Sequence, residues 1–170
     1  MLKLVLPKGS LERATLELFE AADLPVLRSS SVDYQATIDD PRIDSVRILR
    51  PQEIPTYVSE GLFDLGITGR DWVAETASVV ESLGELKYSK NTSRPIRMVV
   101  AVAGDSPAES VKDLPNGVRV QTEYLESTRR FFEEQGVEAD IRLSYGATGG
   151  IHESSVPRPR ILGCGFVTPC

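Results

Sequence analysis

The segment Gly66-Ile67-Thr68-Gly69-Arg70-Asp71 combines residue types that could hold a phosphate or a carboxylate. Its two glycines would let a ligand approach the backbone, Thr68 offers a hydroxyl, and the planar guanidinium of Arg70 presents a fork of donors to an anion. The other interpretation is a structural turn in which Arg70 pairs with Asp71 or with another nearby acid. The residues by themselves leave both interpretations open.

Two further segments have the composition of anion-binding turns. In Pro7-Lys8-Gly9-Ser10, the ammonium of Lys8 and the exposed amides of a following helix could hold a phosphate. Ser144-Tyr145-Gly146-Ala147-Thr148 offers small side chains, a glycine and hydroxyl groups. Both segments also fit an ordinary solvent-facing loop, because short connecting turns are common in any α/β protein.

The remaining reactive residue types are poor candidates for a site. Arg129 and Arg130 could approach a phosphate, but charges on a helix surface are more often solvated. His152 has no carboxylate or second histidine at a spacing suited to a metal. Cys164 and Cys170 both lie in the last seven residues, so they cannot form a disulfide scaffold for the body of the fold.

The elements that would position these turns alternate between strand and helix patterns. The sequence predicts strands at 2–6, 46–50, 63–67, 97–102, 118–121 and 137–143. Helices are predicted from a Ser10 cap, from Pro51 to a stop at Gly61, around Trp72, and over 127–135. This alternation predicts an α/β fold with largely parallel strands. A break near 90–95 divides it into two lobes, 1–92 and 95–148, followed by residues 149–170.

Composition excludes several broad classes of protein. Hydrophobic residues make up 41% and charged residues 26%, the balance of a globular domain. The net charge of −6 argues against a nucleic-acid binder, although a few local cations can still hold an anionic ligand. No run approaches the ~18 apolar residues of a membrane span, and the first apolar stretch is too short for a signal peptide. A cytoplasmic location without membrane association is therefore expected.

Taken in order, these segments resemble ATP phosphoribosyltransferase over residues ~1–148. The match rests on the opening Leu4–Leu11, on Leu49–Val58, on Gly61–Asp71, and on the later pair Tyr124 and Arg130. The resemblance implies two lobes of the type II periplasmic-binding-protein kind, with substrates between them. It also implies the reaction: adenine N1 of ATP attacks the anomeric carbon of phosphoribosyl pyrophosphate, and pyrophosphate leaves with bound Mg²⁺. The members of this family are homo-oligomers and act in histidine biosynthesis.

Site residues follow from the same resemblance, by position. From the first lobe they are Lys8, Arg50, Gly66, Thr68, Gly69, Arg70 and Asp71, and from the second Tyr124, Gly146, Ala147 and Thr148. Since the transition state has oxocarbenium character, the protein is expected to position two anionic substrates and stabilise the leaving charge. No covalent nucleophile and no protein metal ligand are expected.

The family pattern ends at Gly149. A Glu, an amphipathic helix, an Asp-Ala-Ile strand and a Thr-Gly-x-Thr-Leu phosphate loop would follow in the family, and 149–170 contains none of them. A single inserted nucleotide after codon 148 would explain the change. We therefore expect a disordered, non-family tail, an incomplete second lobe, and no turnover by this polypeptide. The alternative function is a non-catalytic module of the same fold that binds a small anion or nucleotide.

Overall fold

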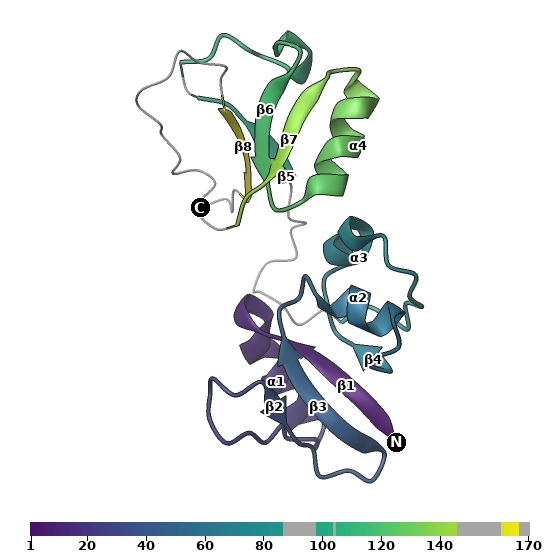
Figure 1. Ribbon diagram of the computed structural model, residues 1–170. Coiled ribbons are helices and arrows are strands. Elements are labelled where there is room, and N and C mark those ends of the chain that lie inside the picture. The colour runs from purple at the N-terminus through teal and green to yellow at the C-terminus, as the bar shows by residue number, and fades with distance from the viewer. Residues whose placement is uncertain (87–97, 104, 146–160, 167–170) are drawn as a thin grey trace. The chain divides into compact units, whose positions relative to one another are not determined.

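The computed structural model of the chain describes residues 1–86, 98–103, 105–145 and 161–166. The chain divides into two compact units, Met1–Ser93 and Arg94–Cys170, which are described separately (Figure 1). The division falls inside the break near 90–95 that the sequence predicts. Among the described residues, no helix has both the length and the apolar content needed to cross a bilayer.

The first unit contains a four-stranded sheet of order β2-β3-β1-β4. Strand β1 is parallel to both of its neighbours, β3 and β4, while the short β2 is antiparallel to β3. In chain order the elements are β1 (Leu2–Pro7), the 3-10 turn η1 (Gly9–Leu11), α1 (Glu12–Ala21), β2 (Gln35–Ala36), β3 (Ile43–Leu49), α2 (Ile54–Ser59), β4 (Leu65–Gly66) and α3 (Arg70–Thr76).

Strand β1 is buried on both faces. Leu4 and Leu6 belong to a core cluster that also contacts Phe19 of α1. Val5 points to the other face, where α2 packs on β1 and β4, and it has no exposed surface. A central parallel strand with helices on both sides requires such a continuous apolar run. The rigid strand therefore fixes where the turn after Pro7 lies.

The start of α1 differs from the sequence prediction. The side chain of Ser10 does not cap the helix; Ser10 lies inside η1, and the N-cap residue of α1 is Leu11. Gly9 has φ +83°, a left-handed conformation that glycine adopts without strain. This turn redirects the chain after β1, and α1 begins one residue later than a Ser10 cap predicts.

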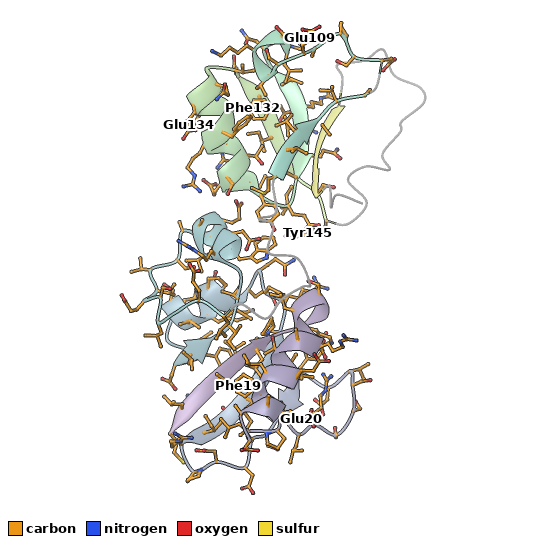
Figure 2. The ribbon with its side chains drawn as sticks, turned by 180° about the vertical axis from the view of Figure 1, so that it is seen from behind. Phe19, Glu20, Glu109, Phe132, Glu134 and Tyr145 are labelled. Carbon is orange, nitrogen blue, oxygen red and sulfur yellow. The ribbon has the colours of Figure 1, made fainter. Side chains whose placement is uncertain are left out.

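The second unit contains a sheet of order β5-β8-β6-β7 with α4 against β7 (Figure 1). Phe132 of α4 is buried in a core cluster with Val118, Val120 and Val137, and Figure 2 shows its ring between the helix and the strands. The elements are β5 (Met98–Ala101), η2 (Val111–Asp113), β6 (Val118–Thr122), α4 (Leu125–Gln135), β7 (Ala139–Leu143) and β8 (Ile161–Phe166). Helix α4 ends at Gly136, as the sequence predicts, with φ +68°.

Strand β8 corrects one prediction about the tail. The sequence shows no strand pattern after residue 148, yet β8 pairs antiparallel with β5 and parallel with β6. The pattern missed this strand because Gly163 and Gly165 interrupt its apolar residues, and glycine is depleted in strands. Residues 146–160 and 167–170 lie outside the described parts, so the expectation for the rest of the tail stays a prediction.

Candidate functional site

In the first unit, the turns that are predicted to bind a ligand lie at one edge of the sheet. Because β1, β3 and β4 are parallel, their carboxyl ends meet at the same edge. Lys8 follows β1 and donates its backbone N–H to Leu49 O at 2.7 Å, and Ile67 N donates to Val5 O at 3.1 Å. This edge is where α/β proteins usually bind ligands. It carries Lys8, Arg50, Gly66, Thr68, Gly69, Arg70 and Asp71.

Lys8 and Arg50 give this edge its positive charge. Pro7 and Leu49 are partners in the register of β1 and β3, so the two cations follow at adjacent positions on neighbouring strands. Lys8 is half-buried and Arg50 is exposed. Within the described residues, neither side chain lies within salt-bridge distance of a carboxylate. Two adjacent cations without a carboxylate partner favour binding of an anion from outside.

The amide of Gly9 is not free to hold a phosphate, contrary to the sequence-based interpretation. It donates to Glu12 Oε2 at 3.1 Å, and Glu12 Oε1 accepts from Arg28 Nη2 at 2.6 Å. The Glu12 and Arg28 side chains are only 18% and 15% exposed. Arg28 therefore neutralises the carboxylate that sits next to Lys8, and the turn keeps the positive charge of Lys8.

Thr68 links two turns of the site. Its hydroxyl donates a hydrogen bond of 2.8 Å to the carbonyl oxygen of Pro51, directly after Arg50. A hydroxyl has one proton to donate, so Thr68 cannot donate to a ligand while this bond persists. Its lone pairs remain able to accept. Thr68 thus forms a structural link between the turns after β3 and β4, and its contact with a ligand stays a prediction.

Arg70 forms an ion pair outside its own turn. Its Nη1 lies 2.6 Å from Glu85 Oε1, and the two side chains are 88% and 58% exposed. This is the alternative left open from the sequence, in which another acid pairs with Arg70. Exposed ion pairs of this kind are worth little, typically 0–1 kcal/mol. A multiply charged phosphate could therefore displace Glu85.

Packing explains one of the two glycines of the turn. A Cβ built on Gly66 would lie 2.7 Å from Ile54 Cγ2 and 3.0 Å from Val5 Cγ1, so the close approach of α2 requires glycine here. Gly69 is the N-cap residue of α3, and the carboxylate of Asp71 folds back over it, 2.0 Å from a built Cβ. The packing of α2 accounts for Gly66, whereas the Asp71 carboxylate at Gly69 is the end of a flexible side chain and imposes no requirement for glycine.

The site residues predicted for the second unit are described by themselves. Tyr124 is 4% exposed and precedes α4, with its backbone N–H donating to Thr122 Oγ1 at 2.9 Å. It packs as a core residue at the start of that helix, and its contact with a ligand stays a prediction. Gly146, Ala147 and Thr148 lie outside the described residues.

Sequence patterns alone missed three residues that contact this edge. Tyr34 places its ring under the Lys8 ammonium, 4.0 Å from Nζ to the ring centroid, and Glu12 and Arg28 hold the Gly9 amide. Long-range contacts of this kind leave no periodic signal. No cluster of three His, Cys, Asp or Glu side chains able to hold a metal is found in the described part of the chain.

Comparison with known families decides the identity of the fold. A family model described as ATP phosphoribosyltransferase (HisG) matches residues 50–153, which include Arg50 and the turn after β4. The chain belongs to the ATP phosphoribosyltransferase family. The family membership predicted from the sequence is therefore confirmed, and the match ends close to residue 148, where the sequence departs from the family pattern.

Individual members of the ATP phosphoribosyltransferase family agree with this assignment. The protein from Pelotomaculum thermopropionicum is 47% identical over 148 residues, covering 86% of this chain and 50% of that protein. The one from Desulforudis audaxviator is 45% identical over 147 residues, with coverages of 86% and 50%. The chain thus spans about half the length of the curated relatives it matches.

A solved structure shows a related fold. It is the ATP phosphoribosyl transferase (HisG:HisZ) complex from Thermotoga maritima, with a TM-score of 0.67 and 26% identity. The similarity covers 86% of this chain and 66% of that one. The predicted mixed α/β fold is confirmed.

Proposed function

We propose that this chain supplies a substrate-binding part of an ATP phosphoribosyltransferase. The reaction would join adenine N1 of ATP to the anomeric carbon of phosphoribosyl pyrophosphate, release pyrophosphate, and serve histidine biosynthesis. The observation that carries this proposal is the pair Lys8 and Arg50, two cations at the carboxyl edge of a parallel sheet in a member of this family. Both substrates are polyanions, which matches the charge of that edge.

The first unit would contribute binding and electrostatic stabilisation. Lys8 and Arg50 would contact substrate phosphates, and Arg70 would exchange Glu85 for a phosphate oxygen. When the bond to pyrophosphate breaks, negative charge grows on the leaving group, and preorganised cations lower the energy of that state. Thr68 would keep the turns after β3 and β4 at a fixed separation through its bond to Pro51. None of these side chains forms a covalent bond to substrate in this proposal.

Magnesium fits this site as a companion of the substrate. Mg²⁺ is usually held by one or two carboxylates together with substrate phosphates and water. Asp71 lies at the described edge, and no cluster of three ligating side chains occurs among the described residues. These residues therefore suit an Mg²⁺ ion that binds together with the pyrophosphate group of the substrate. There it would neutralise the negative charge of the leaving pyrophosphate.

Several family properties belong to the same proposal. The two units would form the two lobes of a type II periplasmic-binding-protein-like arrangement, with Tyr124, Gly146, Ala147 and Thr148 contributed by the second. Assembly into homo-oligomers and a cytoplasmic location are proposed with them. The solved relative from Thermotoga maritima is a HisG:HisZ complex, which supports partner subunits as a general feature.

A chimaera tests the proposed function directly. Residues 1–148 would be joined in frame to the part of the Pelotomaculum thermopropionicum relative that lies outside its matched half. We expect pyrophosphate release from ATP and phosphoribosyl pyrophosphate at about 1 per second or faster, an ordinary enzymatic rate. A folded chimaera without turnover, beside an active parent relative, would contradict the proposal and favour the non-catalytic binding module.

Two matched lysine substitutions in the chimaera test whether the substrate binds near Lys8. Lys8→Met should lower kcat/KM about 10-fold, since it removes a charge-assisted contact worth ~1.5 kcal/mol. Lys3→Met removes the same charge from the opposite end of β1 and should leave kcat/KM unchanged. Equal effects of the two variants would show that only net charge matters and would place the substrate elsewhere.

A further inference from the structure

The segment between Leu27 and Thr37 forms a closed, internally bonded loop. Leu27 and Thr37 exchange backbone hydrogen bonds of 2.8 Å in both directions, which closes its base. Inside the loop, Asp33 accepts from Ser29 Oγ at 2.5 Å and from Gln35 N at 2.9 Å. The hydrogen bond from Ser29 holds the pKa of Asp33 below its usual value, so the brace is intact at neutral pH. A braced loop can hold side chains in fixed positions.

One end of this loop holds the Lys8 side chain. Tyr34 lies beneath the ammonium at 4.0 Å from the ring centroid, within the range of a cation–π contact. Its carbonyl oxygen accepts from Ile48 N at 2.9 Å, which ties the residue to β3. Tyr34 is 52% exposed and Lys8 is half-buried, so the contact forms at the surface. Lysine has four rotatable side-chain bonds, and a fixed ring below Nζ restricts where its charge can lie.

The other end of the loop holds the backbone of the same turn. Arg28 bonds Glu12, and Glu12 accepts from Gly9 N, the residue directly after Lys8. Gly9 has φ +83°, and its carbonyl oxygen accepts from Glu12 N within η1, but no atom lies within 4 Å of a built Cβ, so no side chain packs on its Cα. The Arg28–Glu12 pair is mostly buried and adds a side-chain restraint on the Gly9 N–H. Residues of one loop thus contact both the Lys8 side chain, through Tyr34, and the Gly9 N–H, through Arg28 and Glu12.

We propose that the loop between Leu27 and Thr37 is a positioning element that holds the Lys8–Gly9 turn in the conformation that binds anions. Tyr34 positions the Lys8 ammonium, and Arg28, through Glu12, positions the Gly9 backbone. This inference rests on the proposed function, because it assumes that Lys8 contacts phosphate. It assigns to Tyr34, Arg28 and Glu12 a role that acts through Lys8 rather than through the ligand.

A double-mutant cycle with inorganic pyrophosphate tests the loop. Isothermal titration of the 170-residue chain should show about 3- to 5-fold weaker binding for Tyr34→Leu, the size of an exposed cation–π contact. Tyr34→Phe keeps the ring and should restore the affinity. In a Lys8→Met background, Tyr34→Leu should cause no further loss. A purely structural role would predict the same loss in both backgrounds, and that result would overturn the proposal.

Variants of Arg28 provide a second, independent test of the loop. Arg28→Met should weaken pyrophosphate binding about 5-fold, whereas Arg28→Lys keeps a charge opposite Glu12 and should bind within 2-fold of the wild type. Thermal unfolding of each variant confirms that it is folded. If Lys8→Met itself has no effect, the proposed site is wrong. If Lys8→Met weakens binding but Tyr34→Leu does not, only the positioning role is overturned.

Discussion

The hydroxyl of Thr68 donates a 2.8 Å hydrogen bond to the carbonyl oxygen of Pro51. The two residues follow β4 and β3, which are separated in the sheet by β1. The bond therefore joins the turns on either side of β1, the strand that Lys8 follows. It couples the position of Arg50, directly before Pro51, to the turn that carries Arg70.

Replacing Thr68 by valine should loosen this link. Thr68→Val removes the donor with little change of shape and leaves the Pro51 carbonyl without its partner, which should lower the free energy of unfolding by about 1 kcal/mol. Urea denaturation measures the loss, and Thr68→Ser, which keeps the hydroxyl, should retain most of the stability. Equal stability of Thr68→Val and the wild type would show that water replaces the bond without cost.

A methyl group at Gly66 should disturb the packing of α2. The added Cβ would meet Ile54 Cγ2 at 2.7 Å and Val58 Cγ2 at 3.1 Å, so Gly66→Ala should destabilise the chain by about 1–3 kcal/mol. Gly84→Ala is the matched control, because no atom lies within 4 Å of its built Cβ. If both alanine variants unfold at the same urea concentration, α2 does not pack on β4 as described.

The pH dependence of stability should include a contribution from Asp40. Hydrogen bonds from the Arg42 side chain and amide lower the pKa of Asp40 from 3.8 to about 2. A lowered pKa stabilises the folded state above the unfolded value, and this stabilisation is lost as pH falls from about 4 towards 2. The stability difference between the wild type and Asp40→Asn should therefore shrink over that interval.

The control for this pH effect is Asp39→Asn, which removes a neighbouring exposed carboxylate. Urea midpoints measured between pH 2 and pH 6 should converge for wild type and Asp40→Asn at the acidic end.

Asp40 lies in the turn before β3, at the amino end of that strand. Pyrophosphate affinity at neutral pH should consequently be unchanged, and a loss of affinity would contradict the assignment of the site to the carboxyl edge.

The strands and helices with strong apolar patterns could be predicted from the sequence. The run Leu4-Val5-Leu6 and the helix ending at Gly136 both lie where their residues indicate, because burial and a left-handed glycine are local signals. The largely parallel pairing that the sequence predicts brings the turns after β1, β3 and β4 to one edge of the sheet.

Partners brought together by tertiary structure could not be predicted in this way. Glu12 accepts a hydrogen bond from the Gly9 amide at the start of η1, and Arg28 pairs with Glu12 from sixteen residues away. Arg70 finds Glu85 rather than Asp71, fifteen residues along the chain. Strand β8 forms with two glycines because neighbours on both sides, β5 and β6, supply its hydrogen bonds. Each outcome depends on contacts that no local pattern encodes.

The most direct test of the central claim is to map the ligand on the first unit by NMR. Phosphoribosyl pyrophosphate and ATP, each with Mg²⁺, would be titrated into the ¹⁵N-labelled chain while backbone amide shifts are followed. The proposed site predicts that the largest shifts occur at Lys8, Gly9, Arg50 and the turn 67–71, and that they are strongly reduced by Lys8→Met. Shifts concentrated at the opposite edge, near Arg42 and Asp64, with none at Lys8 or Arg50, would contradict it.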